Sequence, residues 1–341
     1  MFKQVVFLLA FLGNTVALWA DDVFPPGEMA DGNFVPGTVL IYDHGQWRMT
    51  EEKNAVDPEK YTFVIIHGAH CSLKANYISR LADALEKERP DANILAVDWN
   101  AWSSVGSTEI IDWGMTITFK ILGKNKHDKT TLKDIFEEIV QKVIPLEQAR
   151  HIPEIADRLN WKLFGEAGKR RTFVTIDPGT KEEIRTKMSA LGLDPAKTHL
   201  IGHSHGAHVA GLIGTTLRRN RAGKLDRISA LDPSTSIVHD YPENLMGSGW
   251  DASSARIVAV FRTTLFFSSD KETTNDSFYF DWRSKGHPFH HPPMGGQFFK
   301  WPQDVLNAEF QCHRGIFDQF AEFIQKTDFL NENPKLNKRF K

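Results

Sequence analysis

The pentapeptide Gly202-His203-Ser204-His205-Gly206 decides the fold class of this chain. It follows the apolar run His199-Leu200-Ile201 and precedes a helix-like stretch at residues 207–212. A nucleophilic serine needs such a tight strand-to-helix turn, because the turn lifts the hydroxyl clear of the sheet and the glycines relieve crowding. The pattern therefore predicts Ser204 at the carboxyl end of a buried strand. The alternative is a glycine-rich helix start in which Ser204 is simply buried.

Short apolar runs on both sides of this motif predict further buried strands. Five stretches are aliphatic or β-branched and flanked by turn residues: Thr62–Ile66, Asn93–Val97, His199–Ile201, Ile228–Leu231 and Arg256–Phe261. Helical patterns fall between several of them, at residues 75–88 and 181–191. This alternation predicts an α/β fold with a mainly parallel central sheet and helices on both faces. In such sheets, ligands bind at the carboxyl ends of the strands.

The composition is that of a globular protein rather than a disordered or fibrous one. The 341 residues are 41% hydrophobic and 25% charged, so the chain can bury a substantial core. The formal charge is -2, which gives no overall electrostatic reason to bind nucleic acid or an anionic membrane. The sequence has no internal repeat and no sharp linker, which favours a single domain.

The first twenty residues have the features of an export signal. Lys3 gives a positive start, residues 5–12 are an unbroken apolar run, and Ala17 or Ala20 offers a cleavage point. A membrane anchor is the alternative, but polar residues end the run well short of the roughly 20 apolar residues that a span needs. We therefore expect residues 1–20 to be a signal peptide and the protein to be secreted, in an extracellular or periplasmic location.

A serine hydroxyl is a poor nucleophile at neutral pH, so Ser204 would need a base, an orienting carboxylate and donors for the oxyanion. In this type of fold the chain order is Ser, then Asp, then His. Asp232 ends a predicted strand, so its carboxylate is expected at the same edge of the sheet; its alternative role is to cap a turn. Asp226 and Asp240 are weaker choices, because one precedes that strand and the other lies in a loop beyond it. His313 comes late, at the start of a helical run, where a loop is expected to reach across the strand ends.

Four motifs, in order along the chain, resemble those of the pancreatic lipase and phospholipase A1 family of α/β-hydrolases. They are Val64-Ile65-Ile66-His67-Gly68, Ala96-Val97-Asp98-Trp99, the serine motif from His199 through Gly211, and Leu231-Asp232-Pro233. Four ordered motifs are far more specific than one pentapeptide. The family's F-x-E-x-I pattern is matched at residues 320–324, in register with His313, which favours His313 over the histidines at 287–291 as the base.

The resemblance implies an α/β-hydrolase fold and a set of catalytic roles. Ser204 would be the nucleophile, Asp232 the orienting acid and His313 the general base. The oxyanion donors would be the backbone N–H groups of Ala69 and His205. His203 matches the family and is expected to pack beneath the turn rather than to take part in catalysis.

The sequence also departs from the family pattern. No second cysteine lies between Gly296 and His313, so a disulfide-closed lid is not expected there. Only 28 residues follow His313, so we do not expect the C-terminal β-sandwich domain that many of these lipases carry. Calcium is not predicted, because Ser254 stands where the family has a second aspartate beside Asp251.

The segment between Trp102 and Lys181 is much longer than its counterpart in the family. We therefore expect a lid-like insertion at about 103–180 within a single catalytic domain at 21–341. Apolar and polar residues alternate along residues 111–121, which predicts a ribbon that covers the active site. An extra edge strand packed permanently on the core is the alternative. The candidate substrate-binding residues are Trp113, Ile117, Phe119, Phe298, Phe299 and Trp301.

Only two cysteines are present, Cys71 and Cys312. Assembly of the site would bring both to the same rim, since Cys71 follows Ala69 closely and Cys312 adjoins His313. One disulfide and two buried free thiols both remain open. Two cysteines cannot form a structural zinc site alone, and the histidines at 287–291 sit between prolines rather than at helical spacing, so no metal is predicted.

These observations together predict a secreted serine carboxylic-ester hydrolase that acts on lipid esters, as a triacylglycerol lipase or a phospholipase A1. We expect no cofactor, no nucleic acid and no obligate protein partner, and any contact with a lipid interface should be local and apolar. A non-catalytic lipid-binding or storage relative on the same fold is the alternative from another class. A peptidase or thioesterase is a weaker alternative among enzymes.

Overall fold

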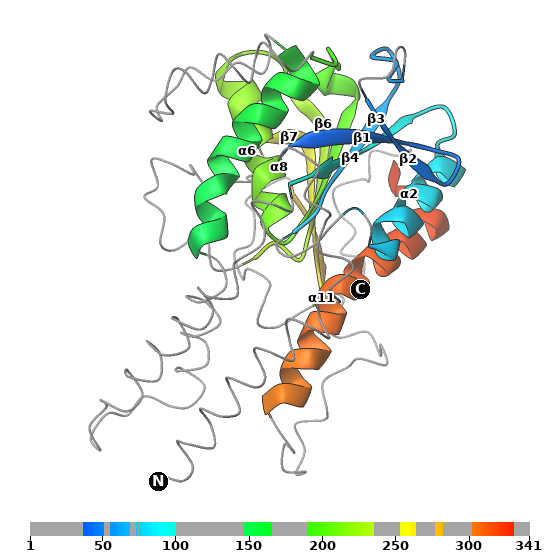
Figure 1. The fold of residues 1–341 in the computed structure, drawn as a ribbon, viewed down its shortest axis with the longest axis vertical. Coiled ribbons are helices and arrows are strands. Elements are labelled where there is room, and N and C mark those ends of the chain that lie inside the picture. Colours follow the sequence, from blue (N-terminus) through cyan, green and yellow to red (C-terminus); the bar gives the residue numbers. More distant parts are fainter. Residues whose placement is uncertain are drawn as a thin grey trace, which may run out of the picture.

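Eight strands form one sheet in the order β2-β1-β4-β3-β5-β6-β7-β8 (Figure 1). The computed structural model describes residues 37–50, 55–68, 73, 75–99, 146–165, 190–234, 253–263, 277–281 and 302–330. The strands are β1 (Thr38–Asp43), β2 (Gln46–Met49), β3 (Thr62–Ile66), β4 (Asn93–Asp98), β5 (Thr198–His203), β6 (Leu225–Leu231), β7 (Ala255–Arg262) and β8 (Ser277–Asp281).

Most of the sheet is parallel. The six strands from β4 to β8 in the sheet order run in one direction, and β1 pairs antiparallel with both β4 and β2. The five predicted strands correspond to β3, β4, β5, β6 and β7, while β1, β2 and β8 were not predicted. The order of the parallel strands from β4 to β8, with helices in the crossovers from β3 to β6, is that of the α/β-hydrolase fold, which confirms the predicted fold class.

Two pairs of helices cover the sheet (Figure 1). The helices α6 (Leu146–Phe164) and α8 (His205–Arg219) lie on one face, and α2 (Asn76–Glu88) and α11 (Pro302–Lys326) lie on the other. Two short 3₁₀ helices are η2 (Pro195–Lys197) and η3 (Asp328–Leu330). Among the described residues, no helix is both long enough and apolar enough to cross a membrane.

Alternating side chains of the strands fill two separate cores. Along β3, Val64 and Ile66 pack with α6 and α8, whereas Phe63 and Ile65 pack with α2 and α11. All four side chains are fully buried, as expected for a strand covered on both faces. The ring centroids of Tyr77 and Phe317 lie 4.9 Å apart and join α2 to α11. The two helix pairs therefore fix the sheet from both sides.

The helix α6 lies inside the segment that was expected to be an insertion. Its buried residues repeat at helical spacing and belong to the core beneath α8: Ile152, Ile155, Ala156, Leu159 and Leu163. This part of the segment is therefore a core helix rather than a lid. The ribbon predicted at residues 111–121 lies outside the described residues. The same holds for most of the helix predicted at 181–191, and its last two residues, Ala190 and Leu191, are not helical.

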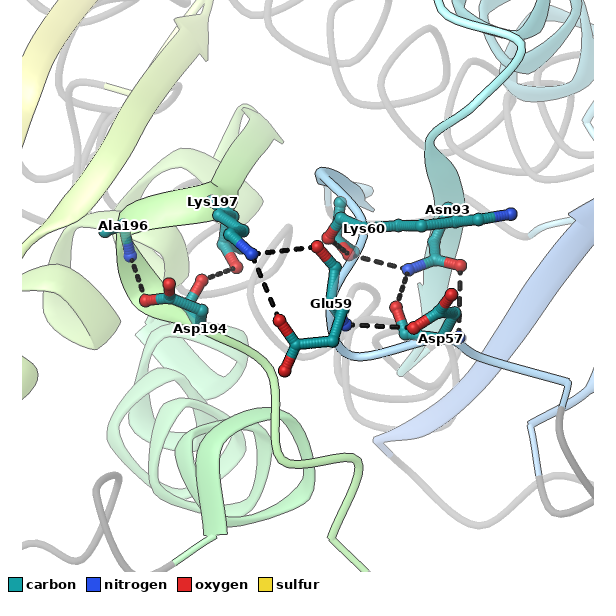
Figure 2. Close-up of polar contacts among 9 residues, drawn as sticks. Asp57, Glu59, Lys60, Asn93, Asp194, Ala196 and Lys197 are labelled. Carbon is teal, nitrogen blue, oxygen red and sulfur yellow. Dashed lines mark hydrogen bonds and ion pairs between the residues drawn. The ribbon is translucent and has the colours of Figure 1, made fainter.

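Polar contacts tie together the amino ends of three central strands (Figure 2). The side-chain amide of Asn93, the first residue of β4, donates to the Asp57 carbonyl at 2.7 Å and to the Thr62 hydroxyl at 2.9 Å. Just before β5, the Lys197 ammonium donates to the Glu59 carbonyl at 3.0 Å and lies 3.2 Å from its carboxylate. These contacts help to fix the register of β3, β4 and β5. The residues that follow these strands at the opposite, carboxyl edge of the sheet are therefore held in fixed positions relative to one another.

Candidate active site

The residues that end or follow five parallel strands gather at one edge of the sheet. They are His67 after β3, Trp99 after β4, Ser204 after β5, Asp232 after β6 and Thr263 after β7. Each contacts a neighbouring strand end through the hydrogen bonds or close approaches described below. The carboxyl edge is where ligands bind in sheets of this kind, so this cluster is the candidate site.

Ser204 occupies a strained turn between β5 and α8. Its φ of 53° and ψ of -118° lie in a region that residues with a side chain rarely adopt. The Ser204 N–H donates to the Leu231 carbonyl at 2.9 Å, and the Ser204 carbonyl accepts from the Ala207 N–H at 3.2 Å. The strand, turn and helix predicted around Ser204 are therefore observed.

Three glycines allow this turn to pack against the end of β3. A Cβ on Gly206 would collide with the Ile66 carbonyl oxygen, and one on Gly202 would collide with the backbone of Gly206. A Cβ on Gly68 would lie 2.7 Å from the Ser204 Cβ. The first turn of α8 can therefore approach β3 only because these positions lack side chains.

Asp232 is fully buried just beyond the end of β6 and also has a positive φ, of 40°. Its N–H donates to the Phe261 carbonyl at 2.8 Å. The Thr263 N–H donates to Oδ1 at 2.7 Å, and the Thr263 hydroxyl donates to Oδ2. These donors satisfy a carboxylate that would be costly to bury alone.

Asp226 has a different role at the amino end of β6. It accepts a hydrogen bond from the Tyr61 hydroxyl at 2.6 Å and one from the Arg256 Nε–H at 2.8 Å. Burial and the Asp226 carboxylate raise the pKa of Tyr61, so its hydroxyl stays protonated and continues to donate. Asp226 is therefore part of a structural cluster away from Ser204.

His313 faces Asp232 from α11. Its Nδ1 lies 3.5 Å from the Asp232 Oδ2, and its side chain is buried. The sequence predicts a loop that ends in a helix start at His313, and this expectation is wrong. The helix begins at Pro302, so His313 is held within a continuous helix rather than on a loop.

A fully buried histidine, His67, orders the segment after β3 and was not predicted to do so. Its Nδ1–H donates to the Gly68 carbonyl at 2.8 Å, and its Nε2 accepts from the Trp99 N–H at 3.3 Å. The Trp99 indole N–H donates to the His67 carbonyl at 2.9 Å. Burial lowers the pKa of His67, although Asp98 and the bond to Gly68 oppose this shift, so the ring is neutral and keeps one donor and one acceptor.

The predicted oxyanion donors are described only in part. His205 is the first residue of α8, and amide groups in the first turn of a helix have no acceptor within the helix. Ala69 and Cys71 lie outside the described residues, as do the six candidate substrate-binding residues. Cys312 lies on α11, but its side chain is not among those described. Within the described ranges, no three His, Cys, Asp or Glu side chains come together as metal ligands.

Residues 182–268 match the family model named Lipase. This segment is similar to the lipase family over about a quarter of the chain. It runs through β5, α8, β6 and β7, and so contains Ser204, Asp232 and Thr263. The predicted resemblance to lipases is therefore confirmed for the part of the chain that carries the serine turn and the buried aspartate.

Relatives with similar sequences include pancreatic triacylglycerol lipases. The pancreatic triacylglycerol lipase of Oryctolagus cuniculus is 39% identical over 80 residues, which are 24% of this chain and 16% of that protein. The human pancreatic triacylglycerol lipase is 40% identical over 75 residues, or 22% and 15% of the two chains. The matches thus cover less than a fifth of these relatives.

Solved structures of esterases also show a weak similarity that extends over most of this chain. A carboxylesterase from Lactobacillus plantarum is 13% identical with a TM-score of 0.34, over 87% of this chain and 95% of that one. An esterase from Pyrobaculum calidifontis is 11% identical with a TM-score of 0.29, over 95% and 91%. The fold assignment itself rests on the strand order given above.

Proposed function

We propose that this protein is a secreted serine hydrolase that cleaves the carboxylic ester bonds of lipids. The observation that carries the proposal is the placement of Asp232 Oδ2 at 3.5 Å from His313 Nδ1, at the edge where Ser204 occupies its strained turn. The lipase family match over residues 182–268 supports the same reading. Serine, histidine and aspartate act together in ester hydrolysis, and the three candidates come from two strand ends and one helix.

His313 would act as the general base in this reaction. With Nδ1 turned to Asp232, Nε2 is the nitrogen left to take the proton of the Ser204 hydroxyl. The serine oxygen attacks the ester carbonyl carbon, and Asp232 stabilises the imidazolium that forms. The oxyanion is held by backbone N–H groups, for which His205 and Ala69 are our candidates.

The reaction is then completed in two stages, acylation of the serine and hydrolysis of the acyl-serine. His313 returns its proton to the departing alcohol oxygen as the C–O bond breaks, which leaves an acyl-serine. Water attacks the acyl carbonyl while His313 accepts its proton, and the acid is released as Ser204 regains its hydrogen. All protons are thus carried by one imidazole, and the reaction consumes only water.

The lipid substrate is the finer part of the proposal. Triacylglycerol and phospholipid cleaved in the manner of a phospholipase A1 are the two substrate classes we infer. The residues proposed to line the acyl site are Trp113, Ile117, Phe119, Phe298, Phe299 and Trp301. An ester lipid needs apolar walls around a few placed polar groups, and this set would provide them.

A fluorophosphonate probe and one variant test the proposal. The wild-type chain should be labelled at Ser204 and should hydrolyse p-nitrophenyl esters, and Ser204→Ala should lose labelling together with about 10⁴-fold or more of the turnover. Near-normal turnover by Ser204→Ala would remove the proposed nucleophile. A wild-type chain that binds lipid but neither labels nor hydrolyses would instead be a non-catalytic relative. Fatty acid release from triolein compared with phosphatidylcholine distinguishes the two substrate classes.

A further inference from the structure

Two buried histidines flank Ser204 and have no part in the chemistry described above. His203 is the last residue of β5, and His208 lies in the first turns of α8. Each residue is 1% exposed. Each also donates a hydrogen bond to a backbone carbonyl in a segment that carries one of the other two proposed catalytic residues.

His203 holds the segment of the proposed base. Its Nε2–H donates to the backbone carbonyl of His313 at 2.9 Å. The centroids of the two imidazole rings lie 4.4 Å apart, and that of Phe317, one turn further along α11, lies 4.8 Å from His203. The strand β5, which ends just before Ser204, therefore fixes the position of α11 next to the proposed base.

His208 holds the segment of the proposed acid. Its Nε2–H donates at 2.8 Å to the carbonyl of Ser234, two residues beyond Asp232. The positive φ of Asp232 is a conformation that persists only where surrounding contacts enforce it. Burial lowers the pKa of His208 to about 4, partly offset by the bond to Ser234, so the ring stays neutral at neutral pH.

We propose that His203 and His208 are positioning residues, His203 for the base His313 and His208 for the acid Asp232. The inference rests on the proposed function, because it assigns the two histidines to the alignment of that triad. Neither side chain would touch the substrate. A displacement of about 1 Å between reacting groups can cost on the order of 100-fold in rate, so loss of either bond should lower kcat and leave KM nearly unchanged.

Paired substitutions in the full chain test the role of each hydrogen bond. His203→Leu and His208→Leu remove the donor, whereas His203→Gln and His208→Gln place an amide N–H near the position of the imidazole Nε2. With p-nitrophenyl butyrate, the leucine variants should lose about 10- to 100-fold in kcat with KM within about twofold. The glutamine variants should recover most of that loss.

His199→Leu is the matched control. His199 is also a buried histidine of β5, but it lies toward the amino end of the strand, where its Nε2 is 2.8 Å from the Ser229 hydroxyl. Its loss should lower the melting temperature and leave kcat unchanged. Folded leucine variants of His203 and His208 with wild-type kcat would overturn the inference, as would losses of kcat that only follow the fall in melting temperature.

A double variant separates the two positioning roles. In an Asp232→Asn background, His208→Leu should change kcat by less than about threefold, because its effect passes through Asp232. His203→Leu should lower kcat further in the same background, because it acts on His313. The opposite pattern would contradict the assignment of each histidine to its partner.

Two further results keep this inference distinct from the proposed function. Failure of the wild-type chain to react with fluorophosphonate would defeat the proposed function, whereas equal labelling rates in the wild type and the leucine variants would defeat only the inference. If a leucine variant does not fold, glutamine and the shorter asparagine are compared at the same position. Equal kcat in those two variants would overturn the positioning role.

Discussion

Thr263 donates two hydrogen bonds to Asp232, one from its backbone N–H and one from its hydroxyl. The hydroxyl bond goes to Oδ2, the same oxygen that lies 3.5 Å from the His313 Nδ1. The buried Asp232 carboxylate, which faces His313, is thus also held by the residue that follows the neighbouring strand β7. This arrangement makes Thr263 a contributor to the site that no local sequence motif identifies.

Replacement of Thr263 by valine should weaken the site without unfolding the protein. Valine keeps the shape and the backbone donor but leaves Oδ2 with one donor fewer. We expect kcat for p-nitrophenyl esters to fall by about 10-fold, the cost of one lost hydrogen bond to a charged group. Thr263→Ser retains the hydroxyl and should recover most of the activity. Equal activity of the valine and serine variants would show that the hydroxyl bond is irrelevant.

Replacement of Asp232 by asparagine should be far more damaging to turnover. The asparagine oxygen can still accept from the Thr263 N–H, but the neutral amide cannot stabilise the imidazolium of His313. We expect kcat to fall by about 10⁴-fold, with the fold judged intact by circular dichroism. A loss of less than about 10-fold would exclude Asp232 as the orienting acid.

Two glycine-to-alanine substitutions should change stability in opposite directions. In Gly206→Ala the new methyl group collides with the Ile66 carbonyl oxygen and separates α8 from β3, so we expect a loss of about 3 kcal/mol or more in the free energy of unfolding. In Gly315→Ala the methyl group meets nothing within 4 Å, and the helix gains up to about 1 kcal/mol. Urea denaturation measures both, and a stable Gly206→Ala variant would refute the close approach.

Acid should destabilise the fold through its buried histidines. The pKa of His208 falls from 6.5 to about 4 on folding, so between these values the unfolded chain binds the proton more readily and stability is lost as the pH falls. The loss from His208 amounts to about 2 kcal/mol by pH 5. His67 and His199 act in the same direction, because burial lowers the pKa of each.

Urea unfolding of His208→Gln at pH 7 and pH 5 isolates the contribution of that ring. The stability difference between the two pH values should be about 2 kcal/mol smaller in the variant than in the wild type. The variant still contains His67 and His199, so part of the acid sensitivity should remain. An identical pH dependence in both proteins would show that His208 is already protonated or exposed in the folded state.

The central strands could be predicted from the sequence because they are buried on both faces. Such strands are continuous apolar runs, as Thr62–Ile66 shows, whereas β2 is mostly exposed and its sequence Gln-Trp-Arg-Met carries no strand pattern. The helix α6 does have apolar residues at helical spacing, but Pro153 inside it argues against a helix. Tertiary packing on the sheet overrides that local signal.

Some residues of the candidate site could be predicted from their neighbours in the sequence, whereas contacts between distant segments could not. Ser204 was predictable because its turn is encoded by adjacent residues, and Asp232 because it ends a strand. The contact of Asp232 with His313 joins distant segments, and only the order of motifs along the chain indicated it. The prediction of a loop before His313 did not take Pro302 into account. The ring of proline suits the first position of a helix, and α11 begins there. The roles proposed for His208 and Thr263 rest on contacts between elements that no local sequence pattern indicates.

The contact between Lys197 and Glu59 marks a suitable point at which to attach the protein to a solid support. It lies at the amino ends of β3 and β5, a strand length of roughly 17 Å from the edge that carries Ser204. The Glu59 side chain is 86% exposed, so a thiol introduced by Glu59→Cys would be open to a support or a fluorescent label. A protein anchored there would present the serine edge outward, away from the surface that holds it.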